Sequence, residues 1–302
     1  MHYNFIKNQK YFLSLSAILV AGGIIAFFVW GLKPGIDFTG GALLEVEYKT
    51  DRPANADVSS VVEGITEKPI IQQVGNKGLI IRTKTIDEPT HQKIVNALKE
   101  KISGDNVLTE KQFQTIGPSI SAELKQKSYS AIALVLIAII LYIAFAFRKV
   151  SRPVSAWKYG VCAVLALTHD IFIPVGIFAA LGHYKGVEID TLFVTALLTI
   201  LGFSVHDTIV VFDRIRENLL KYSKESFEQV VDRSVNQTMV RSISTSFTVL
   251  LVLLAVFFFG GATIKYFVLT LIVGVIFGTY SSIFVASPLL VLWQRRAAVA
   301  KR

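Results

Sequence analysis

Two histidine–aspartate pairs, His169-Asp170 and His206-Asp207, lie within long apolar stretches of the chain. An ionisable side chain inside hydrocarbon is costly, about 2.5–3.5 kcal/mol for Asp on insertion scales, and usually marks an ion pathway or a buried polar pair. The two pairs therefore predict a function that is carried out inside a membrane.

Asp207 has a cation within reach. If Asp213 marks the cytoplasmic end of its span, Asp207 lies about 9 Å inside the membrane by helical rise. Arg241 enters the next span from the same side, and its long side chain is expected to reach Asp207. Burial favours a neutral acid and a nearby cation favours the carboxylate, so a movable Arg241 would make proton binding switchable. The alternative is a static carboxyl group that is hydrogen-bonded to Ser or Thr of a neighbouring helix.

Asp170 lies deeper, about 18 Å from its cytoplasmic end by helical rise. Pro174, one turn later, is expected to free a backbone carbonyl and kink the helix. For Asp170 a static lock and a proton relay both remain open. His169 and His206 are each expected to be hydrogen-bonding neighbours, because residues i and i+1 point about 100° apart and adjacency alone makes no dyad. The candidate proton-relay residues are therefore Asp207, Arg241, Asp170, His206 and His169.

Composition supports a membrane protein, since 52% of the 302 residues are hydrophobic, 18% are charged and the mean hydropathy is +0.53. A span of the hydrocarbon core needs about 20 apolar residues. Six stretches meet this length, namely residues 11–32, 128–147, 159–181, 191–212, 242–259 and 266–293. The sequence predicts a polytopic α-helical membrane protein with six transmembrane helices.

Lys and Arg residues set the orientation. Outside the segment 33–127, sixteen of them lie before the first span, in the loops that follow the second and fourth spans, and in the tail, against two in the remaining loops. The positive-inside rule then makes both termini cytoplasmic. The net charge of +9 reflects this topology and anionic lipid rather than nucleic acid. The predicted divisions are 1–32 with the first span, 33–127 outside, 128–293 as the remaining bundle and 294–302 as a basic cytoplasmic tail.

Residues 33–127 are enough for a small extracytoplasmic domain. Alternating and helical patterns predict the order βαββαβ, with strands at 42–48, 70–74, 79–83 and 107–116 and helices at 55–66 and 88–102. This order predicts an α+β ferredoxin-like fold. The segment has no catalytic constellation or phosphate-binding glycine loop, so it is expected to be a contact surface. No i, i+3 or i, i+4 ligand pair occurs among the intramembrane polar residues, so neither a metal nor a cofactor is expected.

Two short motifs flank the spans. Gly35, Asp37, Phe38, Thr39, Gly40 and Gly41 form the first, which is interpreted as a turn that joins the first helix rigidly to the outer domain, or as a functional contact. The second contains Asp213, Arg214, Arg216, Glu217 and Asn218 at the cytoplasmic surface. Ser226 and Gln229 then form a capping-box pattern, and residues 214–240 are expected to contain a helix in the cytoplasmic interface.

The chain resembles the SecF family of bacterial protein-export membrane proteins, within the RND superfamily. The resemblance covers nearly the whole chain and rests on residues 35–41 (GIDFTGG), 168–170 (THD), 202–218 (GFSVHDTIVVFDRIREN) and Ser287-Pro288. It implies that Asp207 is the proton-carrying carboxylate and that Arg241 is its partner, although the family often has Asn in place of His206. It also implies a multi-pass protein of the bacterial cell membrane that pairs with SecD and works with the SecYEG translocon on unfolded preprotein. Such a subunit is driven by protons and is not an enzyme.

Two other functions remain open, a small-molecule exporter half of the same superfamily and a scaffold whose carboxylates never titrate. An outer domain of about 95 residues has little room to enclose a ligand cavity of several hundred Å³, which favours protein export over the exporter. A scaffold has no need of titratable residues inside two spans, which favours proton use.

Overall fold

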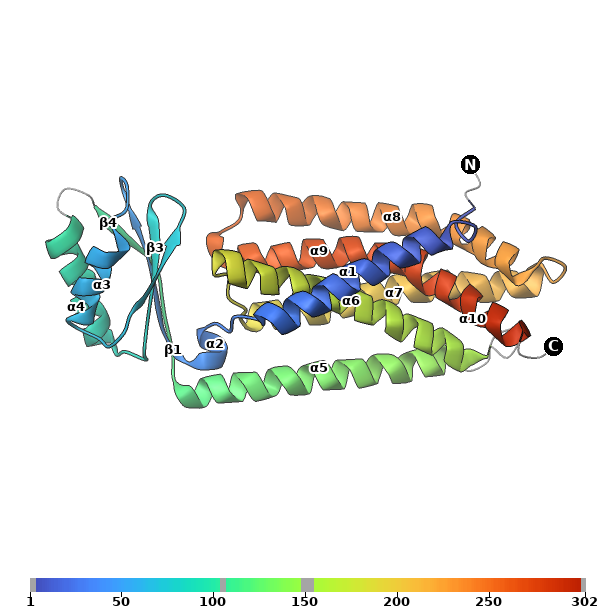
Figure 1. Cartoon of the computed structure of the whole chain (residues 1–302), viewed down its shortest axis with the longest axis horizontal. Helices are drawn as coiled ribbons and strands as arrows, with labels where there is room; N and C mark the ends of the chain where they lie inside the picture. Colours follow the sequence, from blue (N-terminus) through green and yellow to red (C-terminus); the bar gives the residue numbers. More distant parts are fainter. Residues whose placement is uncertain (1–3, 104–106, 148–154, 300–302) are drawn as a thin grey trace. The chain divides into compact units, whose positions relative to one another are not determined.

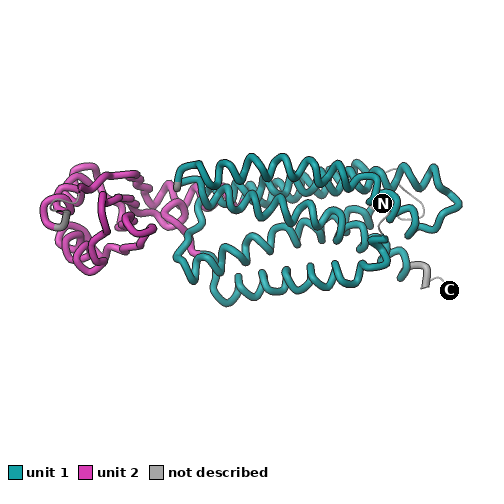
Figure 2. The backbone as a smooth tube through the Cα atoms, turned by 90° about the horizontal axis from the view of Figure 1, so that it is seen from above, with its two compact units in different colours: residues 1–32, 130–302 teal, residues 33–129 magenta. Residues whose placement is uncertain are grey.

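The structure is a computed structural model that describes residues 4–103, 107–147 and 155–299. The chain divides into two compact units, residues 1–32 with 130–302 and residues 33–129 (Figure 2). The second unit spans residues 33–129, and the sequence predicts an outer domain at residues 33–127. Arg148, Lys149 and Arg152, which contributed to the expected orientation, lie outside the described residues, as do Lys301 and Arg302 of the tail.

The smaller unit has the predicted βαββαβ order. Its main elements are β1 (Gly41–Tyr48), α3 (Asn55–Glu63), β2 (Ile70–Val74), β3 (Gly78–Thr83), α4 (Glu88–Leu98) and β4 (Leu108–Ile116). The strands form one antiparallel sheet in the order β2-β3-β1-β4 (Figure 1). In this order β3 lies between β1 and β2, the two strands that α3 connects, which is the split βαβ arrangement of ferredoxin-like domains.

Alternation of side chains along β1 explains how this domain closes. Leu44, Val46 and Tyr48 are buried while the residues between them are partly exposed, so β1 presents one apolar face. Both helices cover that face, with Val58 of α3 and Ile94 of α4 in the same core cluster. The domain is a two-layer sandwich, with its helices on one face of its sheet.

A side-chain cap starts α4. The Oδ1 of Asp87 accepts a hydrogen bond from the backbone N–H of Thr90 at 3.1 Å, and Pro89 occupies the first turn of the helix. Hydrogen bonding to Thr90 lowers the pKa of the Asp87 carboxyl group. An acidic N-cap followed by proline is the arrangement that favours a helix start at this position.

The larger unit contains the membrane helices. Six helical segments of the described chain are long and apolar enough to span a membrane, which confirms the predicted number. They are α1 (Gln9–Trp30), α5 (Pro118–Ala146), α6 (Ala156–Lys185), α7 (Thr191–Lys221), α8 (Phe227–Phe259) and α9 (Lys265–Ser281), the last continued by η3 (Ser282–Ala286) and α10 (Ser287–Val299). α6 runs through Pro174 without ending, although proline offers no N–H to the carbonyl of Asp170 four residues earlier.

Glycines allow the inner helices to approach closely. A Cβ at Gly274 of α9 would lie 2.1 Å from Ile200 of α7, and one at Gly278 would lie 3.1 Å from Ser204. The small-xxx-small spacing of Gly274 and Gly278 therefore brings α9 against α7. A Cβ at Gly176 of α6 would lie 2.3 Å from the Cα of Gly23, so α1 and α6 touch backbone to backbone.

The segments that are rich in Lys and Arg meet at one end of the bundle. The N–H of Ile6 donates to Asp232 Oδ1 at 3.2 Å, and Arg295 pairs with Glu228 at 2.5 Å. Ile6, the start of α8 and the end of α10 therefore lie together.

The segment 214–240 is divided differently from the expected interfacial helix. Residues 214–221 continue α7, a short turn follows, and α8 runs without a break from Phe227 to Phe259. The expected capping box is present, because Ser226 and Gln229 bond each other's backbone N–H groups. The residues from Phe227 to Ser242 have a helical pattern throughout. The helix therefore begins well before the apolar stretch at 242–259.

Candidate functional site

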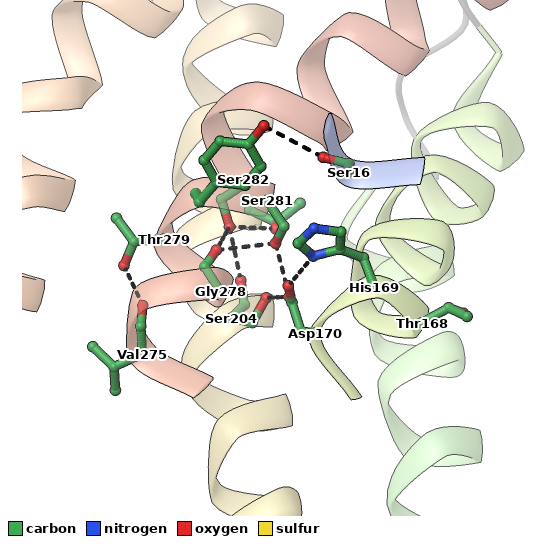
Figure 3. A network of polar contacts seen from close by, with 12 residues as sticks. Ser16, Thr168, His169, Asp170, Ser204, Val275, Gly278, Thr279, Ser281 and Ser282 are labelled. Atoms are coloured by element: carbon green, nitrogen blue, oxygen red, sulfur yellow. Dashed lines mark hydrogen bonds and ion pairs between the residues drawn. The ribbon is translucent and has the colours of Figure 1, made fainter. Parts of the chain in front are cut away.

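Asp170 on α6 is completely buried, and donors from three directions face its carboxyl group. Ser281 Oγ of α9 donates to Oδ2 at 2.8 Å, and Ser204 Oγ of α7 donates to the same oxygen. His169 Nδ1 lies 2.9 Å from Oδ1 (Figure 3). Asp170 therefore joins α6, α7 and α9, and both of its carboxyl oxygens have partners.

His169 is a partner of Asp170 despite its adjacency in sequence. The 2.9 Å contact shows that neighbouring helix positions do not prevent this pair from bonding. The imidazole is buried, stacks on Tyr280 with ring centroids 5.9 Å apart, and its Nε2 accepts or donates no hydrogen bond within the described part of the chain. The contact fits the expected role of a hydrogen-bonding neighbour.

Hydroxyl groups continue from Asp170 toward the middle of α7. Ser282, the first residue of the π-helical turn η3, donates to the carbonyl oxygen of Ser204 at 3.3 Å, and its Oγ lies 2.8 Å from Thr208 Oγ1. π-helical turns inside α-helices often occur at functional sites. The polar contacts of Asp170 thus extend to the neighbour of Asp207.

Asp207 has a different environment. Its side chain is 8% exposed, and Ser242 Oγ of α8 donates to Oδ1 at 2.5 Å. The other oxygen, Oδ2, is buried and accepts no hydrogen bond from any residue that the structure describes. Asp207 is therefore a buried carboxyl group in which Oδ1 accepts a hydrogen bond and Oδ2 accepts none from the described residues.

Arg241 and His206 lie beside this carboxyl group but on the outside of the bundle. Both side chains are exposed, and both are near enough to act electrostatically on Asp207. Among the ion pairs of the described residues, none joins Asp207 to Arg241 or to His206. In this structure the hydrogen bond to Asp207 comes from Ser242, and the pairing of Asp207 with Arg241 stays a prediction.

The glycine-rich motif forms one helical turn, α2 (Ile36–Thr39), followed by two glycines with positive φ. Gly41 has a φ of 120°, and a Cβ there would lie 2.7 Å from the carbonyl oxygen of Thr83, so only glycine fits without a shift. Thr39 donates to the carbonyl of Gly35 at 3.0 Å, Asp37 is buried, and Phe38 is partly buried. The motif is therefore a tight turn that leads into β1, which is the structural one of its two interpretations from the sequence.

The cytoplasmic motif fastens α7 to α8. Asn218 is buried and donates to Ser234 Oγ and to Gln237 Oε1, both at 2.8 Å. Along the helix surface Arg214 pairs with Glu217, and Arg216 pairs with Asp213, each at 2.6 Å. The bonds of Asn218 hold α7 to α8, whereas the two ion pairs lie along α7 itself.

The serines that contact the two carboxyl groups were not named as site residues from the sequence. Ser204 lies three residues before Asp207, and Ser242 opens the polar run Ser-Ile-Ser-Thr-Ser. That run was the available signal, because hydroxyl residues within an apolar helix tend to face other helices. Ser281 had no comparable signal.

Comparisons with known proteins show what the chain is similar to. The family model described as "Protein export membrane protein SecD/SecF, C-terminal" matches residues 95–296, and the one described as "SecD/SecF GG Motif" matches residues 25–51. "Protein translocase subunit SecF" of Thermobaculum terrenum is 46% identical over 96% of this chain and 94% of its own length. The protein with the same name from Anaerolinea thermophila is 39% identical over 96% of this chain and 94% of its own length.

A solved structure has the same fold. The crystal structure of SecDF, a translocon-associated membrane protein from Thermus thermophilus, superposes with a TM-score of 0.84 at 31% identity. The match covers 98% of this chain and 39% of that chain. The present chain thus spans nearly the whole of its curated relatives and well under half of the solved protein.

Six apolar helices and a small antiparallel sheet domain define a multi-pass membrane protein. The chain belongs to the SecD/SecF family of protein-export membrane proteins, and its SecF relatives match it along nearly their full length.

Proposed function

We propose that the chain is a Sec translocase subunit that uses the proton gradient, together with SecD, to promote preprotein export through SecYEG. The observation that carries this proposal is Asp207, a buried carboxyl group with one oxygen free of protein donors and with Arg241 at its edge. A group of this kind is neutral once it has bound a proton, and it attracts the guanidinium when it is ionised.

Proton transfer would then move helices. When Asp207 is ionised, the exposed guanidinium of Arg241 is drawn toward it, because an unpaired charge in a low-dielectric site is costly. When Asp207 binds a proton, that attraction is lost and α8 can return. Each proton that crosses a potential of 100 mV releases about 2.3 kcal/mol, enough to bias a domain motion but not to unfold a stable substrate in one step.

The exposed side of α7 and α8 supports a SecD partner. His206 is exposed within the apolar stretch of α7 and Arg241 is exposed at the start of the apolar stretch of α8, and charged groups rarely face lipid. A second set of helices with polar groups would cover them. The solved SecDF chain is long enough to contain such a second half, because this chain matches only 39% of it.

Localisation follows the same proposal. The protein would span the bacterial cell membrane with both termini in the cytoplasm and residues 33–127 outside. The meeting of the basic segments at one end of the bundle supports this orientation, through the contacts of Ile6 with Asp232 and of Arg295 with Glu228. The outer domain would contact the emerging preprotein.

The two alternative functions have less support. An open surface depression of the outer domain, about 680 Å³, is lined by Glu67 and Lys84, which pair at 2.5 Å, and by other residues that are mostly polar, whereas small-molecule sites are concave and mostly apolar. A scaffold explains the fully bonded Asp170 but not the unpaired oxygen of Asp207.

Preprotein translocation into membrane vesicles tests the proposal. Vesicles would contain SecYEG, SecD and either the natural chain, Asp207→Asn, Arg241→Met or Asp170→Asn at matched levels. Completion of translocation is measured with and without a proton gradient. We expect the gradient to stimulate the natural chain, to have no effect with Asp207→Asn or Arg241→Met, and to retain part of its effect with Asp170→Asn.

Asn keeps the size and hydrogen bonding of Asp207 but exchanges no proton, and Met keeps the length of Arg241 without its charge. Full gradient stimulation in Asp207→Asn would contradict proton carriage by Asp207 and favour the scaffold.

A further inference from the structure

The hydrogen bond between Ser242 and Asp207 is the feature of the site that the proposed function leaves without a role. We propose that Ser242 is a positioning residue, which holds Oδ1 of Asp207 and thereby makes Oδ2 the atom that binds and releases the proton. This inference deepens the proposed function of Asp207 and rests on it.

Ser242 is fixed in its position by the face of α8 on which it lies. It is 2% exposed, and Val235, Thr238 and Ser246 are buried at spacings of three and four residues on the same helix. Such spacings place side chains on one face of a helix. The hydroxyl group of Ser242 therefore points into the bundle, where it donates to Oδ1 of Asp207 at 2.5 Å.

The two oxygens of Asp207 differ in what surrounds them. Oδ1 has the hydroxyl donor, whereas Oδ2 is buried without a donor from the residues described. A hydroxyl group that donates to one oxygen fixes the carboxyl plane and leaves the second oxygen as the acceptor for a proton. At Asp170, by contrast, both oxygens have a hydrogen-bonding partner.

Ser242 and Arg241 are consecutive, so they cannot both face Asp207 in one setting of α8. Neighbouring helix positions point about 100° apart. With Ser242 buried against Asp207, Arg241 is exposed. A rotation of α8 about its axis would exchange the positions of Ser242 and Arg241. The hydroxyl group would then contact the Asp207 carboxyl group in one state, and the guanidinium would contact it in the other.

Other groups around Asp207 do not replace Ser242. The charged groups that act on it are His206 on its own helix and Arg241 on α8. α9 and η3 contribute hydroxyl groups, among them Ser282, which bonds Thr208. On α6 the titratable group is Asp170 with His169, and its serine donors are separate from the donor of Asp207.

Carbodiimide labelling tests the inference, because carbodiimides modify protonated carboxyl groups. The full chain with SecD in vesicles would be labelled across a pH series, and modification of Asp207 would be quantified by peptide mass spectrometry. The variants are Ser242→Ala, Ser242→Thr and Ser242→Cys. Ser246→Ala is the matched control, since Ser246 is a buried serine one turn further along α8 that bonds Thr279 rather than Asp207.

A hydroxyl donor stabilises an ionised carboxylate more than a neutral acid, so Ser242→Ala should move the labelling midpoint to higher pH by about one unit. Ser242→Thr should restore the natural midpoint, Ser242→Cys should lie between, and Ser246→Ala should leave it unchanged. The pH profile of gradient-stimulated export should shift in the same direction as the labelling.

An unchanged midpoint in both Ser242→Ala and Ser242→Cys overturns the inference. In that case, loss of gradient stimulation in Asp207→Asn still upholds the proposed function. If Asp207→Asn keeps its gradient stimulation, the proposed function fails and the inference fails with it. Equal shifts in Ser242→Ala and Ser246→Ala would also overturn it, because they would show a general effect of loosening α8.

Discussion

Asp170 and Asp207 lie on adjacent helices of one bundle, and each directly follows a histidine, yet their surroundings are opposite. Asp170 is fully buried, and hydroxyl and imidazole groups face both of its oxygens. Asp207 lies at the edge of the bundle with a single donor on one oxygen. Two His-Asp pairs inside membrane spans can therefore differ in the donors that face the carboxyl group. We expect the number of donors on each oxygen to separate a structural carboxyl group from one that exchanges a proton.

The largest difference between the two carboxyl groups should appear in stability. Asp170→Ala removes the acceptor of Ser204, Ser281 and His169, and should lower the free energy of unfolding by about 3 kcal/mol or more, since each buried donor left unpaired costs about 1–3 kcal/mol. Asp207→Ala loses one hydrogen bond and should cost about 1 kcal/mol. Unfolding in mixed micelles measures both. Equal losses would contradict the contrast between the two sites.

Chemical accessibility should separate the two groups next. In the natural chain, a hydrophobic carbodiimide should modify Asp207 at least about tenfold faster than Asp170, because every oxygen of Asp170 is engaged and buried. Peptide mass spectrometry after labelling gives both rates in one sample. Comparable rates would mean that the contacts of Asp170 open as readily as the edge of the bundle at Asp207.

A smaller effect is expected from single serines around Asp170. Ser281→Ala removes one donor but leaves Ser204 and His169 in place, and should cost about 1 kcal/mol of stability without removing gradient stimulation. Ser281→Thr, which retains a hydroxyl group, is the control. Loss of gradient stimulation in Ser281→Ala at normal protein levels would assign Asp170 to the proton path.

The smallest effect should come from His206, in contrast to His169. His169→Phe keeps stacking on Tyr280 but removes the group that faces Oδ1 of Asp170, and should cost about 1–3 kcal/mol because both serines face Oδ2. His206→Gln should leave stability unchanged, since His206 is exposed. A larger stability loss in His206→Gln than in His169→Phe would reverse the assignment of the buried and exposed histidines.

Much of the fold follows from pattern. The period of two in residues 42–48 and the helical patterns at 55–66 and 88–102 predicted the order of the outer domain, and the β2-β3-β1-β4 sheet agrees with it. The six apolar stretches predicted the spans, although the helices of the structure extend beyond several of them. Hydropathy detects the part of a helix that needs lipid, whereas helices can continue into water when their caps and polar contacts allow it.

The contacts within the site were less predictable. Proximity of Asp207 to Arg241 could be inferred from their positions in consecutive spans, but the rotation of α8 decides whether Arg241 or Ser242 faces the carboxyl group. That rotation depends on the whole buried face of α8, from Val230 to Ser246. The bond between His169 and Asp170 depends on rotamers, which sequence spacing does not determine.

The close approach of Gly23 and Gly176 joins α1 to α6, backbone against backbone. Because no side chain lies between them, the two helices cannot separate there without leaving a void. α6 carries Asp170, and α1 ends at Trp30, just before the segment that leads into the outer domain. A displacement of α6 within the bundle is therefore passed to α1, the helix that precedes that domain in the chain.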